Sequence, residues 1–139
     1  MAVRVVIPES PSEADRNAVI EPLRAYNASQ VENPLRRPVA ILLVDEDGAH
    51  MGGLWGKCTY DWLHIELLAI HEDHRGRNYG TMILHEAERL ARSNNCVGIW
   101  LDTFEFQACG FYKKLGFEMF GKIEDHPIGQ NRYFLRKRF

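Results

Sequence analysis

The sequence predicts an α/β domain in which helices flank a mixed, mostly antiparallel sheet. One observation is the apolar run Leu63–Ile70, which a basic turn and then a helical pattern over residues 83–92 follow. A strand, a helix and a further strand in this order normally make the two strands parallel neighbours. The second observation is Glu46-Asp47-Gly48, which separates two strand-like runs as a hairpin turn does and so predicts antiparallel strands.

The first elements are expected to be a strand, a helix and a hairpin. Apolar residues alternate over positions 3–7, which predicts a strand that ends at Pro8. Ser10 or Ser12 then opens a helix, and Ser12 and Asp15 stand at the spacing of a capping box. Pro22 is expected to kink or restart this helix. The hairpin follows, with a strand over 38–45 and a return over 50–62 as one long strand or as two, and the glycines of the return permit a bulge.

The central element is a strand, a turn and a helix between residues 62 and 92. Side chains alternate across a strand, so His64, Glu66 and Leu68 are expected to share a face. Apolar residues at intervals of three and four predict the helix and its buried face. Later strands are expected over 97–103, 117–123 and 132–138, with a short helix from Phe106 or Gln107 to residue 115.

The turn between strand and helix, HRGRNYG at residues 74–80, has the chemistry of a phosphate site. A helix N-terminus leaves amide N–H groups free and carries a partial positive charge. Gly76 and Gly80 let a ligand approach the backbone, and Arg75 and Arg77 add cationic side chains. An ordinary turn with solvated arginines fits the same residues equally well.

Composition narrows the class of protein. The 139 residues suit one compact domain, 1–139, and 45% hydrophobic with 26% charged residues is ordinary for a soluble globular protein. A net charge of −2 argues against wholesale binding to nucleic acid. No apolar run approaches the roughly 18 residues of a membrane span, and no signal peptide is evident, so a cytoplasmic protein is expected. The three cysteines and six histidines lack metal-binding spacing, so no metal is expected.

Two motifs resemble the GCN5-related N-acetyltransferase (GNAT) family, in particular its short bacterial members. The family's coenzyme loop reads Arg or Gln, two residues, Gly, any residue, then Gly or Ala, and Arg75 and Gly80 match its ends. Asn78 replaces the middle glycine, although Asn is the non-glycine residue that best tolerates positive φ. FYKKLGFE, residues 111–118, is similar to the family's later signature. LDTFEFQA and EDHPIGQNRYFLRKRF also resemble short bacterial members.

The resemblance implies a GNAT-like sheet whose central strands splay apart around the pantetheine arm of acetyl-CoA. It implies an N-acetyltransferase that acts on a primary amine of a small molecule or peptide by direct attack, and a homodimer is expected. The Leu68 amide would polarise the thioester carbonyl, Ile70 would hold the pantetheine, and Tyr112 would protonate the coenzyme sulfur. The residues implied to hold the coenzyme's phosphates are Arg75, Gly76, Arg77, Asn78, Tyr79, Gly80 and Thr81.

Several alternatives remain at this point. The catalytic base is one of three groups, Glu66, His64 or a water. His64 falls where some family members carry a base glutamate. The side chains of Glu66 and His64 also fit a polar pair at a sheet edge. Tyr112 fits a core aromatic as well as a catalytic acid. Two departures from the family pattern favour a non-catalytic acyl-CoA-binding or regulatory module. They are Asn78 and Glu105, the second at a position where the family often has Asn. A nucleotide-binding domain of another class is the third hypothesis.

Overall fold

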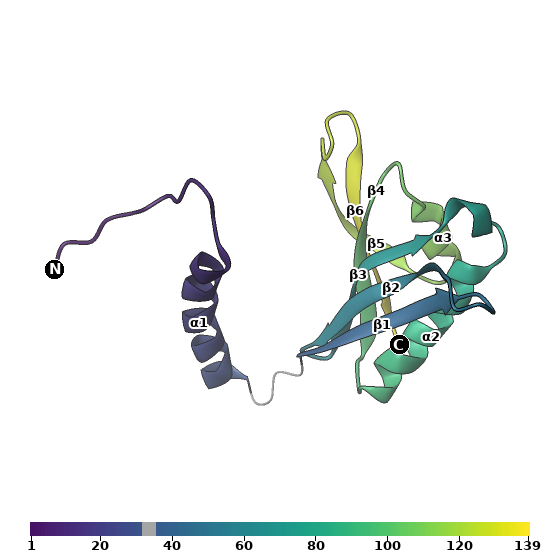
Figure 1. The fold of residues 1–139 in the computed structure, drawn as a ribbon, viewed down its shortest axis with the longest axis horizontal. Coiled ribbons are helices and arrows are strands. Elements are labelled where there is room, and N and C mark those ends of the chain that lie inside the picture. The colour runs from purple at the N-terminus through teal and green to yellow at the C-terminus, as the bar shows by residue number, and fades with distance from the viewer. Residues whose placement is uncertain (32–35) are drawn as a thin grey trace. The chain divides into compact units, whose positions relative to one another are not determined.

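The computed structural model describes residues 1–31 and 36–139 (Figure 1). The chain divides into two compact units, Met1–Pro34 and Leu35–Phe139. Within the described ranges, no helix is long and apolar enough to cross a membrane.

The first unit contains the helix α1, Glu13–Gln30. The predicted capping box is confirmed, because the Asp15 amide donates to Ser12 Oγ at 3.2 Å and the Ser12 amide donates to the Asp15 carboxylate at 2.8 Å. The helix continues through Pro22, so the predicted restart there is wrong. The strand predicted over residues 3–7 is also wrong, since these residues form no strand. A strand is stabilised by the backbone of a neighbour, and none pairs with this segment.

The second unit is built on a sheet with strand order β1-β2-β3-β4-β6-β5 (Figure 1). Only the β3–β4 pair is parallel among the pairs that the described strands form. This arrangement confirms the mixed, mostly antiparallel sheet and the crossover through a helix. The strands are β1 (Arg36–Val44), β2 (His50–Thr59), β3 (Trp62–Ile70), β4 (Gly98–Phe104), β5 (Glu118–Glu124) and β6 (Asn131–Arg138).

The helices α2 (Tyr79–Ser93) and α3 (Cys109–Lys114) share one hydrophobic core with the sheet. On α2 the buried side chains recur at helical spacing, and Ala87 is completely inaccessible. They pack against fully buried strand residues such as Leu63 and Leu135. Each fully buried Leu or Ile contributes roughly 1.5–3 kcal/mol, so this face fixes the position of α2 on the sheet.

A β-bulge in β3 changes which side chains share a face. Adjacent residues of β2 pair with Ile65 and Leu67, so Glu66 is an extra residue in β3. Ile65 before the bulge and Leu68 after it both pack into the core, although they stand three positions apart. The predicted common face of His64, Glu66 and Leu68 is therefore wrong for Leu68, because one inserted residue inverts the alternation.

The parallel strands β3 and β4 separate before they end. Their pairing covers Trp62–Ile65 on β3 and Gly98–Leu101 on β4. Beyond it β3 continues to Ile70 and β4 to Phe104. The splay that the family resemblance implied is present, and it leaves unpaired backbone on the facing edges of both strands.

Candidate active site

A cavity of about 1130 Å³ opens where β3 and β4 separate. Cavities of roughly 300–1,000 Å³ hold drug-sized ligands, so this one is large enough for a long ligand together with a second small molecule. Its walls are β3 beyond the bulge, the turn and first residues of α2, the end of β4, and α3 with the turn before it. The predicted site residues that line it are Glu66, Leu68, Ile70, Arg75, Gly76, Asn78, Tyr79, Gly80, Thr81 and Tyr112, whereas His64 and Arg77 do not.

One end of the cavity is the N-terminus of α2. Asn78 precedes the helix in a left-handed conformation, with φ 63° and ψ 17°, as its place in the motif predicts. The Met82 amide donates to the Asn78 carbonyl at 3.1 Å, so the amides of residues 79–81 come before the first turn closes. The side chain of Asn78, the N-cap residue, makes no capping hydrogen bond. This end therefore offers free N–H groups and a positive helix dipole to an anion.

Gly80 brings the start of α2 close to α3. A Cβ atom at this position would lie 2.9 Å from Cζ of Phe111, a distance that real Cβ atoms essentially never show. Phe111 is the neighbour of Tyr112 in α3. The glycine thus permits the contact between the start of α2 and Phe111, the neighbour of Tyr112.

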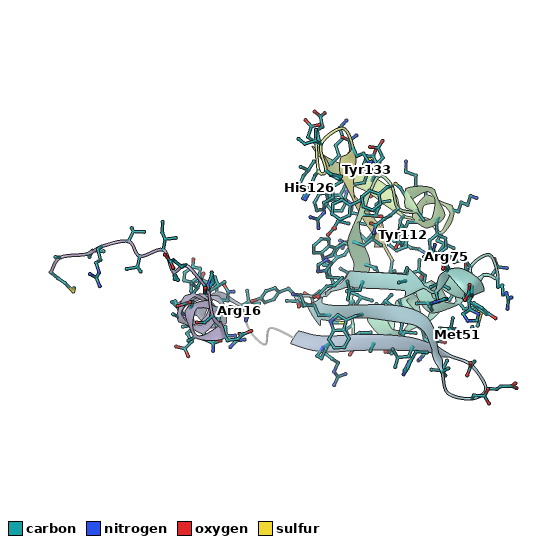
Figure 2. All side chains as sticks on the ribbon, turned by 45° about the horizontal axis from the view of Figure 1, so that its top comes forward. Arg16, Met51, Arg75, Tyr112, His126 and Tyr133 are labelled. Carbon is teal, nitrogen blue, oxygen red and sulfur yellow. The ribbon has the colours of Figure 1, made fainter. Side chains whose placement is uncertain are left out.

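Arg75 ties the turn to the end of β3. Its Nε donates to the carbonyl oxygen of Ile70 at 3.0 Å. This bond leaves the terminal amino groups of the guanidinium, which lines the cavity, for other acceptors. Figure 2 shows Arg75 on the turn before α2 and Tyr112 on α3, and both contribute to the cavity wall.

Tyr112 is a buried phenol that borders the cavity. Its side chain packs between the rings of Phe111 and Phe117, with centroid separations of 5.2 Å and 5.8 Å. Burial raises the pKa of Tyr112 to about 12, because the phenolate would lose its hydration. The hydroxyl is therefore protonated at neutral pH.

His64 lies outside the cavity lining and stacks on Trp100. The two rings are parallel within 3°, with centroids 3.7 Å apart. Burial lowers the pKa of His64, while the carboxylates of Glu66 and Asp102 oppose this shift. Its Nε2 is buried, and no group among the described residues hydrogen-bonds to it. These features favour a neutral imidazole without direct access to a ligand.

Two carboxylates flank the point where the strands part. Glu66 forms an ion pair with Lys57 at 3.4 Å, and 34% of its side chain is exposed. Asp102, on β4, accepts from Nε of Arg132 at 2.8 Å. Both carboxylates line the cavity. Sequence reasoning missed Asp102 because its cation lies 30 residues away and only the pairing of β4 with β6 brings the two together.

The turn after β4 shortens the predicted helix at residues 106–115, which begins instead at Cys109. The side-chain oxygen of Gln107 accepts from the Thr103 hydroxyl at 3.1 Å and from the Phe104 amide at 2.8 Å. These bonds satisfy backbone in a turn and replace the missing helical turn. Glu105 accepts from the Asn131 amide at 2.8 Å and does not line the cavity.

No group of three or more His, Cys, Asp or Glu side chains that could hold a metal ion occurs among the residues that the structure describes. The cavity wall carries two carboxylates, phenol groups, a guanidinium group and backbone amides.

Comparisons with known proteins agree on one family. The model of the acetyltransferase (GNAT) family matches residues 8–117. An acetyltransferase of Agrobacterium fabrum is 33% identical over 128 residues, which cover 92% of this chain and 93% of that protein. The blasticidin-S acetyltransferase of Streptomyces morookaense is 37% identical over 93 residues, or 66% of this chain and 68% of that one. The crystal structure of a Bacillus cereus acetyltransferase has a TM-score of 0.87 at 33% identity and covers 96% of this chain and 98% of its own.

Proposed function

This chain belongs to the GNAT family of acetyltransferases and is an acetyl-CoA-dependent N-acyltransferase, and we propose that it acetylates a primary amine of a small molecule or peptide by direct attack. The observation that carries the proposal is the continuity of the cavity. One space joins the free amides at the start of α2 to the Tyr112 phenol and the Glu66 carboxylate. In this proposal, coenzyme binding and acetyl transfer occupy two ends of one site.

The donor is held by backbone in this proposal. The diphosphate lies on the amides of the turn over residues 76–81, and the arginines Arg75 and Arg77 add charge. The pantetheine arm follows the edge of β3, where the backbone has no partner on β4 and needs a hydrogen-bonding ligand. On that edge Ile70 holds the arm, and the amide of Leu68 polarises the thioester carbonyl.

The acceptor amine must be neutral when it attacks the thioester carbon. We assign the base to Glu66, directly or through a water, because Glu66 lines the cavity and His64 does not. The inserted position of Glu66 in the bulge aims its side chain independently of the regular alternation of β3. His64, whose imidazole is favoured as neutral, is the second candidate for the base.

Tyr112 completes the transfer. The new C–N bond forms as the C–S bond breaks, and the departing coenzyme thiolate takes the phenolic proton. The raised pKa, about 12, means that the hydroxyl carries its proton at neutral pH, so Tyr112 is a donor and not a base. A well-placed general acid contributes roughly 10²–10⁴-fold to the rate.

A non-catalytic coenzyme-binding module is the rival hypothesis, and the two departures from the family motifs do not favour it. Asn78 keeps the left-handed turn that the motif glycine would supply. Glu105 is engaged with the Asn131 amide at the start of β6 and leaves the cavity wall unchanged. Neither departure removes a feature that the reaction needs.

Thiol release with acetyl-CoA and a panel of primary amines tests the proposal. We expect turnover by the wild type, a kcat roughly 10²–10⁴-fold lower for Tyr112→Phe, and an unchanged affinity for acetyl-CoA. Glu66→Gln should lower kcat/KM far more than His64→Gln if Glu66 is the base. Coenzyme binding without thiol release for any amine would support the rival instead.

We also propose that residues 1–139 form one catalytic domain that acts as a cytoplasmic homodimer. The family match over residues 8–117 spans both units. The three cysteines are free, as expected in a reducing compartment, and twofold dimers are the commonest closed assembly. Light scattering checks the assembly, and a mass equal to the 16.1 kDa chain would contradict the dimer. A calorimetric scan with separate transitions for the two units would contradict the single domain.

A further inference from the structure

The side chain of Phe106 lines the cavity but contributes little to the core. It is 65% exposed within its unit and lies in the turn between β4 and α3. A large apolar side chain gains stability from burial, which this position does not provide. Its exposure at the wall of an active-site cavity points to contact with a ligand.

The Phe106 ring is held in a fixed orientation. It stacks on Phe104 with the two planes parallel within 1° and the centroids 5.4 Å apart. The Phe104 ring is in turn contacted edge-on by His126 at 5.3 Å and covered by the Arg132 guanidinium at 5.1 Å. One face of Phe106 therefore rests on a supported aromatic stack, and the exposed remainder can receive a second planar group.

The backbone beneath this stack is also fixed. Gln107 holds the end of β4 through its two side-chain hydrogen bonds. Glu105 and Asn131 exchange two further bonds, each of 2.8 Å, which join the turn to the start of β6. A turn with these four bonds presents Phe106 with little loss of conformational entropy on binding.

The cationic end of the acceptor has its own position on the same wall. Both contacts from Arg132 go to Oδ1 of Asp102, which leaves Oδ2 for another donor. Glu66, on β3, lines the same cavity and is paired with Lys57 at 3.4 Å, so an amine where the strands part has a carboxylate on each of the two strands. Asp102 and Phe104 lie two residues apart on β4, so their side chains share one face of that strand.

We propose that the acceptor is a primary amine joined to a planar ring. The ring stacks on Phe106, and the amine lies between Glu66 and Asp102. This inference rests on the proposed acetyl transfer and names the class of acceptor for it. Phe106 is then the residue that determines specificity for the ring.

Two series of amines test this inference on the full-length protein. One series runs from benzylamine to 5-phenylpentylamine, and the other contains straight-chain aliphatic amines with the same numbers of methylenes. We expect kcat/KM for the best phenylalkylamine to exceed that of the aliphatic amine with the same number of methylenes by roughly tenfold. Equal kcat/KM values for the two series would overturn the inference.

A substitution separates stacking from a structural effect. Phe106→Leu should raise KM for the best phenylalkylamine by roughly tenfold and leave KM for aliphatic amines and acetyl-CoA unchanged. Phe120→Leu is the matched control, because Phe120 is a 46% exposed aromatic on β5 that does not line the cavity. An equal loss for both series in Phe106→Leu would contradict a stacking role. Aliphatic turnover reports on acetyl transfer itself, so a lack of thiol release with every amine would overturn the proposed function rather than the stacking.

Discussion

Asn78→Ala probes the step on which the whole site depends, the conformation of the turn before α2. Asn78 adopts φ 63° and ψ 17°, a left-handed conformation in which a Cβ atom crowds the following carbonyl. Asn adopts this left-handed region several times more often than other non-glycine residues, whereas Ala rarely does. The substitution removes a small exposed side chain and leaves the rest of the cavity wall intact.

The size of the effect follows from the backbone energy. A left-handed residue with a Cβ costs about 1–2 kcal/mol, which shifts the turn away from its binding conformation by about 5–30-fold. The apparent affinity for acetyl-CoA falls by up to the same factor, because only the competent fraction binds. We therefore expect KM for acetyl-CoA to rise by up to about 30-fold at an unchanged kcat, and Asn78→Gly to bind at least as well as the wild type.

Asn95 supplies a matched control at the other end of the same helix. It has φ 60°, follows the C-cap of α2 and does not line the cavity. Asn95→Ala should lower the free energy of unfolding by about 1 kcal/mol and leave KM unchanged. Steady-state thiol release and urea unfolding measure the two quantities. A wild-type KM in Asn78→Ala, or an equal rise in Asn95→Ala, would refute the reasoning.

Two further predictions concern stability. Burial lowers the pKa of His64 below its usual 6.5, so the folded state binds this proton less tightly than the unfolded chain and stability falls as pH drops below about 6.5. His64→Gln should therefore make Tm decline less steeply between pH 7 and pH 5. His85→Gln, which changes an exposed histidine, should leave the decline as in the wild type. An equal decline of Tm in both variants would contradict this. A Cβ at Gly98 would lie 2.5 Å from the Trp62 ring and 2.7 Å from a backbone oxygen, so Gly98→Ala should cost roughly 1–3 kcal/mol in urea unfolding. Gly110→Ala, where nothing lies within 4 Å, should be neutral or stabilising, and a similar loss there would remove the steric explanation.

Local patterns were sufficient to predict most of the second unit. The helical spacing of apolar residues predicted α2. The order of a strand, a helix and a strand predicted the parallel β3–β4 pair. The tolerance of Asn for positive φ anticipated the conformation of Asn78. These features depend on residues that lie within a turn or two of one another, which is the range over which sequence patterns carry conformational information.

Two errors have a common physical origin. The alternation over residues 3–7 shows that a strand can form, but it says nothing about whether a neighbour is there to pair with it. The bulge at Glu66 is equally silent in the sequence, because Leu67 and Leu68 are both apolar and either fits the core. Register and pairing are decided by contacts between segments, so a single inserted residue moved Leu68 to the opposite face.

The acceptor side of the cavity depends on contacts that are distant in sequence. Asp102 meets Arg132 only because β6 lies beside β4, and His126 reaches Phe104 from the loop between β5 and β6. The sequence motifs therefore predicted the proposed donor end of the site, which is formed by a continuous segment. The proposed acceptor end could not be predicted from the motifs, because its residues meet only in the folded protein.

A crystal structure with a non-reactive acetyl-CoA analogue tests the central claim most directly. We expect the diphosphate within hydrogen-bonding distance of the amides of Tyr79, Gly80 and Thr81, and the acyl group in the gap between β3 and β4 near Tyr112. A diphosphate bound away from the start of α2, or an acyl group outside the gap, would contradict the account.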